Sequence, residues 1–184
     1  SGSGKGDNLK LQIDMSDFTP ASLPNGGKAP MYNDRIIAHE MVHAVMARSM
    51  NYGDLSSASK WFVEGTAEFI HGADERLKAD IAANNGGLPG AAGDAAGRDA
   101  IVAALGDGFQ MSSLDYSAAY AATRFLHAKI KAKGGGGIRD LMAYLSSHPS
   151  AGLDEAINKA SKKAYTGEAD FLADFAANGA AFIA

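Results

Sequence analysis

The stretch IIAHEMVHAVMARSM, residues Ile36 to Met50, decides both the fold and the chemistry that we expect of this chain. It places His39 and His43 four residues apart, with Glu40 between them, among Ile, Val, Met and Ala. Each residue of an α-helix turns by about 100°, so the two imidazoles lie about 40° apart on one face. Burying such groups is costly unless they are paired or bind a metal. The stretch therefore predicts a helix over residues 34–50 with two ligands of one ion.

Glu40 has a different place from the two histidines. It lies close by on the same face but points beside the position of the ion, so it is placed to touch a ligand of the metal rather than the metal itself. This is the H-E-x-x-H arrangement, in which the carboxylate is the general base toward water activated by the metal. Glu40 is therefore the predicted catalytic base. The helix is apolar almost all round, so we expect it to be buried, with Ile37, Met41 and Val45 packed on its other side.

A second segment, WFVEGTAEFIHGADER at residues 61–76, supplies the third protein ligand that a catalytic zinc site needs. One face of the predicted helix carries four polar or aromatic residues within about 80° of arc: Trp61, Glu64, Glu68 and His71. Two carboxylates on one face of an apolar helix repel each other unless a cation lies nearby. We assign Glu64 as the third ligand, because Gly65 beside it leaves room for close approach. Glu68 would accept a hydrogen bond from the outer N–H of a ligating histidine.

The rest of the chain reads as mainly helical. The expected order is a strand at 9–13, a loop at 16–33, helices at 34–50, 58–72 and 73–84, a flexible Gly-rich loop at 84–97, a short helix at 99–105, a long helix from 112 to 133, a break at the GGGG of 134–137 and three further amphipathic helices. We therefore predict an α+β fold that is predominantly α-helical, with a short N-terminal β element, two metal-binding helices and a helical C-terminal lobe.

Composition limits the classes of function. The chain has 184 residues, of which 46% are hydrophobic and 21% charged, and it carries a formal net charge of −4 without a basic stripe. Nucleic acid and membrane are therefore not expected as partners. There is no cysteine, which excludes disulfides, thiolate ligands and a cysteine nucleophile. We take residues 1–6 as a linker or a remnant of cloning. Residues 7–184 then form one catalytic domain, with an N-terminal part to about 84 and a C-terminal part from about 98.

The segments HEMVH and WFVEGTAEF resemble the gluzincin metallopeptidases, a group of the zincins. More narrowly, HEMVHAVMARSMN and WFVEGTAEFIHGADER resemble the flagellinolysins, which are metallopeptidase domains carried in the hypervariable region of certain bacterial flagellins. The match covers residues 34–78, and the later helices fit the general layout loosely. It implies zinc ligation by His39, His43 and Glu64, with Glu40 as the base. Glu68 takes the place of an acid that is Asp in thermolysin-like relatives.

The segment DYSAAYAATRFLHAKI, residues 115–130, is similar to a gluzincin helix that often brings a tyrosine to the oxyanion. One face of it carries four residues within about 60° of arc: Tyr116, Tyr120, Thr123 and His127. By this resemblance Tyr116 is the first candidate for stabilising the oxyanion and Tyr120 the second. Both tyrosines can instead be core aromatics with a hydrated hydroxyl. His127 lies three turns from Tyr116 and hardly reaches the same atom, and His71 fits an ordinary hydrogen-bonded histidine better than a substrate contact.

The resemblance implies a zinc-dependent endopeptidase that acts on extracellular proteins or peptides. The glycine-containing acidic motif with which gluzincin aminopeptidases hold a free amine is not seen before His39. A substrate strand can add to an edge near residues 9–13. The resemblance also places the domain on the flagellar filament, beside neighbouring flagellin subunits. Two alternatives remain open: a non-catalytic structural domain of such a filament, or a binding module stabilised by zinc with His71 as a fourth ligand. No calcium loop is recognised.

Overall fold

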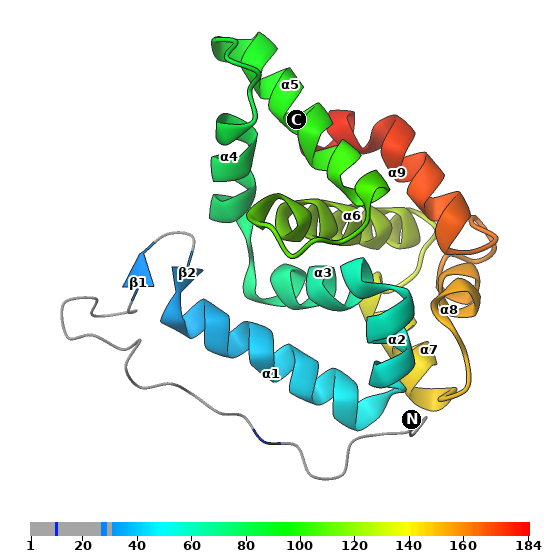
Figure 1. Cartoon of the computed structure of the whole chain (residues 1–184). Helices are drawn as coiled ribbons and strands as arrows, with labels where there is room; N and C mark the ends of the chain where they lie inside the picture. Colours follow the sequence, from blue (N-terminus) through cyan, green and yellow to red (C-terminus); the bar gives the residue numbers. More distant parts are fainter. Residues whose placement is uncertain (1–9, 11–26, 29–30) are drawn as a thin grey trace.

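The structure, a computed structural model, describes residues 10, 27–28 and 31–184 (Figure 1). Helices form most of this part of the chain. In order they are α1 (Asn33–Ser49), α2 (Tyr52–Ala58), α3 (Lys60–His71), α4 (Asp74–Ala83), α5 (Gly90–Ala104), the 3-10 turn η3 (Leu105–Asp107), α6 (Ser113–Ala132), α7 (Ile138–Ser147), α8 (Leu153–Ala160) and α9 (Glu168–Ile183). None of them is long and apolar enough to cross a lipid bilayer.

The expectation of an α+β fold is wrong. Within the described residues the β structure is limited to β1 (Gly27–Lys28) and β2 (Met31–Tyr32), an antiparallel pair in which Gly27 lies opposite Tyr32. Strands of two residues cannot form a layer, because a sheet needs about five residues per strand and several strands to bury one face. The fold is therefore all-helical. The predicted strand at 9–13, apart from Lys10, and the predicted linker at 1–6 lie outside the described residues.

The centre of the molecule is α3, which lies between α1 and α6 (Figure 1). Its residues from Trp61 to Glu68 are all buried. Gly65 makes the close contact with α6 possible, since a Cβ at this position would collide with the carbonyl oxygen of Ala119 and the hydroxyl of Thr123. The facing side of α6 carries buried alanines for the same reason. Small residues thus let two helix backbones approach, and the polar face of α3 is left pointing toward α1.

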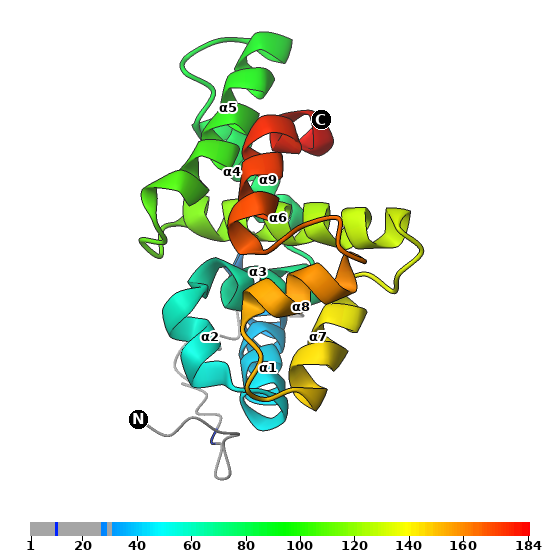
Figure 2. The same ribbon diagram turned by 90° about the vertical axis from the view of Figure 1, so that its right-hand side faces the viewer.

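The later helices complete the core around α6 and the start of α3. Figure 2 shows α9 beside α5 and crossing α6, while α7 and α8 lie toward the α1–α3 side of the molecule. The Trp61 ring stacks on Phe171 with ring centroids 5.5 Å apart. At the start of α9, Glu168 accepts hydrogen bonds from the Ser59 hydroxyl at 2.6 Å and from Trp61 Nε1 at 2.5 Å. The first residue of α9 thereby fixes the N-terminal end of α3.

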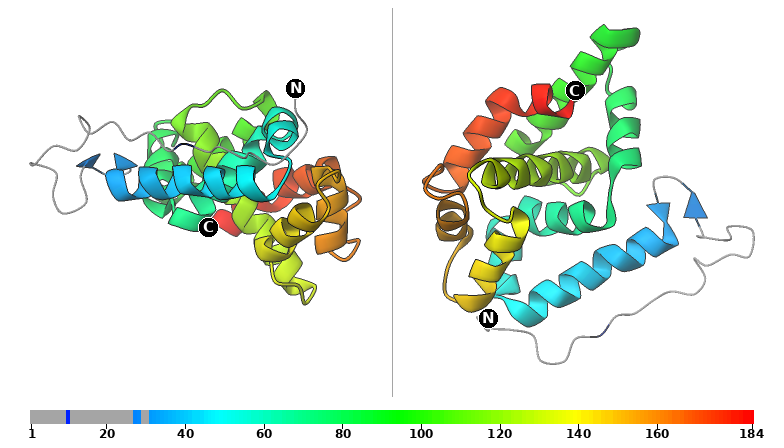
Figure 3. Two further views of the ribbon diagram at one scale, coloured as in Figure 1. Left: turned by 90° about the horizontal axis from the view of Figure 1, so that it is seen from below. Right: turned by 180° about the vertical axis from the view of Figure 1, so that it is seen from behind.

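The N-terminal side of the molecule holds one helix that the sequence did not predict and one prediction that is wrong. Residues 52–58 form α2, held by the buried Leu55. In addition, α1 packs on the other described helices through Val42 and Met46, whereas Met41 and Val45 are 54% and 62% exposed. Figure 3 shows α1 at the edge of the described helices. The prediction that α1 is buried on all sides is therefore wrong. Apolar residues occur all round this helix, but the neighbouring helices cover only part of its surface.

The predicted flexible loop at 84–97 is also shorter than expected. It ends at Pro89, and α5 begins at Gly90. Two of the glycines that suggested a loop are buried inside the helix, and a Cβ at Gly97 would collide with the carbonyl oxygen of Ile81 in α4. These glycines serve close packing of helices, and the intervening alanines have high helix propensity. By contrast, α6 begins as predicted, with Ser112 and Asp115 forming a reciprocal capping box.

Replacing Gly65 with alanine tests the close contact of α3 with α6. We expect Gly65→Ala to lower the free energy of unfolding by about 1–3 kcal/mol, because the added methyl meets backbone that cannot move aside. The matched control is Gly53→Ala in α2, where a Cβ meets nothing within 4 Å and alanine should be neutral or stabilise by up to about 1 kcal/mol. Denaturant unfolding measures both, and equal stabilities would contradict the described packing.

Candidate metal centre

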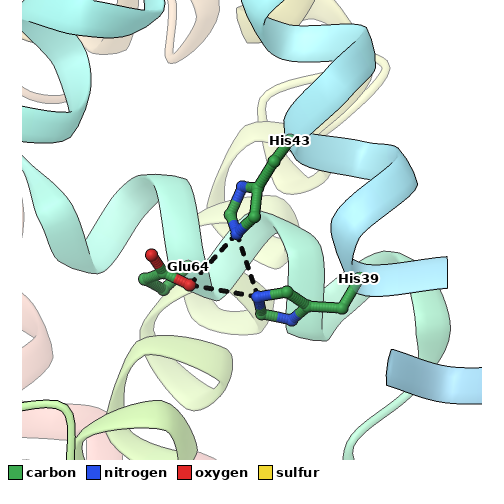
Figure 4. A group of neighbouring side chains, drawn as sticks. All are labelled: His39, His43 and Glu64. Carbon is green, nitrogen blue, oxygen red and sulfur yellow. Dashed lines mark hydrogen bonds and ion pairs between the residues drawn. The ribbon is translucent and has the colours of Figure 1, made fainter. Parts of the chain in front are cut away.

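Three side chains from α1 and α3 meet at one point, as Figure 4 shows. His39 Nε2 lies 2.9 Å from His43 Nε2 and 3.1 Å from Glu64 Oε2, and His43 Nε2 lies 3.2 Å from the same oxygen. The two histidines come from successive turns of α1, and the glutamate comes from the facing side of α3. The structure therefore brings together the three residues that the sequence predicted as ligands, close enough to hold a metal ion.

The donor set and the spacing of this triangle suit a tetrahedral metal. Ligand atoms about 2.0–2.1 Å from a tetrahedral zinc lie about 3.3 Å from one another, and the three distances here fall slightly below that value. Two imidazole nitrogens and one carboxylate oxygen form the ligand set of many catalytic zinc sites, which keep a fourth position for water or substrate. The residues present thus fit a zinc ion.

Glu68 fixes the orientation of His39 from behind. Its Oε1 lies 2.9 Å from His39 Nδ1 and 3.2 Å from His71 Nε2, and its Oε2 lies 3.1 Å from Arg76 Nε. A carboxylate opposite Nδ1 favours the tautomer that donates from Nδ1, so the lone pair of Nε2 points into the triangle. Because the side chain of Glu68 is only 2% exposed, these partners stabilise a buried charge. The predicted hydrogen bond from a ligating histidine to Glu68 is present.

The pKa values of the cluster follow from burial opposed by hydrogen bonds. Burial lowers the pKa of His39, but hydrogen bonds with Glu64 and Glu68 outweigh it and raise the pKa to about 9. Burial likewise raises the pKa of Glu64, yet hydrogen bonds with His39 and His43 bring it to about 2. The pKa of Glu68 also lies at about 2, because hydrogen bonds with His39 and His71 and the charge of Arg76 overcome its burial. Without a metal, a proton therefore occupies the cluster near neutral pH.

Glu40 lies on the open side of the cluster. It is exposed, as a base that must meet water and substrate should be, and it lines a pocket of about 160 Å³ together with His39, Tyr116 and Arg76. The pocket is bounded by the first turns of α1, the end of α3 and the starts of α4 and α6. The pocket thus gives access to the predicted base, Glu40, and to one predicted ligand, His39.

The two predicted tyrosines have different surroundings. The ring of Tyr116 lies 6.0 Å from the ring of His39 and lines the pocket. Burial raises the pKa of Tyr116, and the nearby charge of Glu64 adds to the effect. Tyr120 instead donates its hydroxyl to Asp74 at 2.9 Å and is 4% exposed. This placement favours Tyr116 over Tyr120 as a group beside the cluster.

Sequence reasoning missed a third tyrosine near the cluster. Tyr52, at the start of α2, sets its ring edge-on to His43 with centroids 5.8 Å apart. Burial raises its pKa to about 12, and the charges of Glu64 and Glu40 contribute. A single tyrosine in a short, turn-rich segment has no periodic pattern around it, so only the packing of α2 against α1 reveals its place.

Two further histidines that the sequence analysis considered, His71 and His127, lie outside the triangle, although the ring of His71 is 5.8 Å from that of His39. His71 faces Glu68 through Nε2, which places that nitrogen outside the group formed by His39, His43 and Glu64. His127 packs on Phe69 with centroids 5.0 Å apart and accepts a hydrogen bond from the Ile138 N–H at 3.4 Å. Neither histidine belongs to the group of His39, His43 and Glu64, although His71 forms a second group of possible metal ligands with His39 and Glu68.

Comparisons of the chain with protein-family models, with curated proteins and with solved structures found no match. The resemblance to the gluzincins and the flagellinolysins therefore stays a prediction. What is established of the site rests on the residues and distances given above.

The metal-free protein should show a defined dependence of stability on pH. His39 has a folded pKa of about 9 against an ordinary 6.5, so its contribution is complete below about pH 6.5 and is lost as the pH rises through 9. Glu64 and Glu68, at about 2 against 4.5, contribute fully above about pH 4.5 and lose their contribution as the pH falls through 2. We expect the chelator-treated protein to melt highest between about pH 4.5 and 6.5 and a few degrees lower at pH 9.

Thermal melts from pH 3 to 10 measure this profile. The His39→Gln variant is the control, because it lacks the titrating ring and should lose the decline on the alkaline side. A wild-type melting temperature that stays level, or rises, between pH 6.5 and 9 would contradict the coupled cluster.

Proposed function

We propose that this protein is a zinc-dependent endopeptidase that hydrolyses peptide bonds in proteins by means of activated water. The observation that carries the proposal is the triangle of His39 Nε2, His43 Nε2 and Glu64 Oε2, with the exposed Glu40 next to His39 in the lining of one pocket. A site that only stabilised the fold would need neither an exposed carboxylate next to the ligands nor an open side.

The chemistry divides between the ion and the side chains. When bound, zinc supplies Lewis acidity, which lowers the pKa of water from 15.7 to about 7 and polarises a carbonyl. Glu40 takes a proton from the attacking water while the water oxygen bonds to the carbonyl carbon. Glu40 then passes this proton to the leaving nitrogen as the C–N bond breaks. No covalent intermediate with the protein forms, and Glu40 ends in its starting state.

A tyrosine hydroxyl is proposed to share the negative charge that develops on the carbonyl oxygen. The raised pKa of Tyr116 keeps its hydroxyl protonated, so the group can donate a hydrogen bond in the transition state. Tyr52, whose ring packs against His43, also has a raised pKa that keeps its hydroxyl protonated. Tyr120 is the weaker candidate, because its hydroxyl is already donated to Asp74.

The setting of the activity is proposed from the sequence resemblance alone. A domain of this kind would be displayed outside the cell on a bacterial flagellar filament, next to neighbouring flagellin subunits. Its substrates would then be extracellular proteins or peptides. The alternatives, a structural filament domain or a binding module closed around zinc, have no need for Glu40, and the effect of removing this carboxylate separates them from an enzyme.

Replacing Glu40 separates catalysis from metal binding. We expect Glu40→Gln to keep one zinc per chain and to lose at least about 10³-fold in kcat/KM, because the amide cannot accept the proton. The matched variant Glu64→Ala should lose the zinc itself. Zinc content by atomic absorption and turnover of a quenched peptide pool measure both effects. Undiminished hydrolysis by Glu40→Gln would refute the base, and full zinc in Glu64→Ala would place the third ligand elsewhere.

Removing single phenol hydroxyls identifies the group that supports the oxyanion. We expect Tyr116→Phe to lower kcat roughly 10–10³-fold with unchanged zinc content, since one donor to a developing oxyanion has about that effect. Tyr120→Phe should alter kcat little. Tyr52→Phe reports whether the second phenol takes part. A large loss of kcat in Tyr120→Phe with none in Tyr116→Phe would overturn the order that the structure favours.

A further inference from the structure

A second group of potential metal ligands lies directly behind the triangle. It consists of His39, Glu68 and His71, whose ligand atoms all lie within 4.8 Å of one another. His39 Nδ1 lies 2.9 Å and His71 Nε2 lies 3.2 Å from the same oxygen, Oε1 of Glu68. Figure 4 shows why His39 belongs to both groups: its Nε2 faces His43 and Glu64, and its other ring nitrogen points away from them.

The donor set and the spacing of this second group match those of the triangle. Each group offers two imidazole nitrogens and one carboxylate oxygen, and the ligand atoms of a tetrahedral zinc lie about 3.3 Å from one another. The distances of 2.9 and 3.2 Å fall close to that value. In the metal-free protein, N–H groups of both histidines donate to Glu68 at these distances. An ion that replaced the protons would find its three ligand atoms already gathered from α1 and α3.

The pocket beside Glu40 opens onto this second group. His39, Glu68 and His71 all belong to its lining, whereas His43 and Glu64 do not. Its volume of about 160 Å³ holds an ion together with bound water, since one water molecule occupies about 30 Å³. The side chains of Glu68 and His71 are only 2% and 6% exposed, so the pocket supplies the entry path that a buried metal site needs.

The charges in and beside the pocket favour a cation. Carboxylates outnumber guanidinium groups there by four to two: Glu40, Glu64, Glu68 and Glu75 against Arg35 and Arg76. Arg35 pairs with Glu75, and Arg76 Nε lies 3.1 Å from Glu68 Oε2, so both guanidinium groups are already matched. One divalent ion at the triangle offsets the remaining excess of negative charge. A second ion then lies near Arg76 and the first ion, which lowers its affinity but leaves Glu68 Oε1 as its ligand.

We propose that His39, Glu68 and His71 form a second, weaker site for a divalent metal ion of the zinc class, and that the ring of His39 is shared between two ions. With an ion on Nε2, His39 keeps one proton on Nδ1. The second ion displaces this proton, which leaves to solvent, and the ring then bridges the two ions as an imidazolate. This proposal concerns binding and does not depend on the proposed peptidase activity.

Titration with zinc alone counts the sites. The metal-free full chain is titrated with Zn²⁺ in competition with a chromophoric chelator. We expect two steps of one ion per chain, the second with a dissociation constant roughly 10²-fold or more above the first, because like charges lie close together. Dialysis should then remove the second ion alone. A single step in the wild-type protein would overturn the proposal.

Replacing His71 identifies the ligands of the second step. His71→Gln should lose that step and keep the first, because its amide still donates to Glu68 but does not replace an imidazole ligand. His148→Gln is the matched control, since His148 is an exposed histidine stacked on Tyr144 in another part of the fold, and it should keep both steps. A second step that survives His71→Gln, or that disappears in His148→Gln, would contradict the site.

Glu64→Ala separates the second site from the triangle. The strong step should disappear, and in excess zinc the weak step should remain, because no member of the second group is lost. Adding His71→Gln to this variant should remove the weak step as well. A Glu64→Ala protein that takes up no zinc in excess would refute the second site. A strong step in this variant would refute the triangle and leave the second site in place.

Copper(II) tests whether the ring of His39 is shared. Ions on the two nitrogens of one imidazole lie about 6 Å apart, since each metal–nitrogen bond measures about 2 Å. Unpaired electrons this close couple through the ring, so the wild-type protein with two Cu²⁺ per chain should lose most of its EPR intensity. His71→Gln with one Cu²⁺ should show the full signal of an isolated ion. Two full, uncoupled signals in the wild-type protein would overturn the shared ring.

Discussion

Two carboxylates one helical turn apart on a buried helix are the constraint around which the rest of the molecule is arranged. Glu64 and Glu68 lie on α3, where nearly every neighbouring residue is excluded from water. Their charges are tolerable only because α1 brings two imidazoles, the end of α3 brings His71 and α4 brings Arg76. Each helix packed around α3 on this side therefore supplies a positive or proton-bearing group to one of the two acids.

Much of this arrangement could be predicted from the sequence, because spacing along a helix is a local property. A separation of four positions places His39 and His43 on a common face of α1, and the same separation does so for Glu64 and Glu68 on α3. If the polar faces of these two apolar helices pack against each other, the predicted ligands come together. The distances of Glu64 from His39 and His43 agree with this assumption. The start of α6 at Ser112 was predicted from local sequence in the same way.

What could not be predicted depends on contacts between distant segments or on ambiguous residues. Glycine suggested a loop at 90–97, although there it lets α5 pack on α4. The apolar pattern of α1 suggested burial all round, although the number of covering layers decides exposure and leaves Met41 and Val45 outside. An alternating pentapeptide suggested an α+β fold, although the described part of the chain is helical apart from one short hairpin. Tyr52 and Arg76 reach the cluster through packing that no local pattern encodes.

Glu68 touches groups from α1, from the end of α3 and from α4 with a single side chain. A mutation that removed Glu68 would weaken the contacts among α1, α3 and α4 and would also remove the hydrogen bond that orients the ring of His39. The geometry of the candidate metal site and the packing of three helices thus depend on one side chain. A substitution at this position would alter both together, so we expect related chains to keep this acid even where the surrounding surface differs.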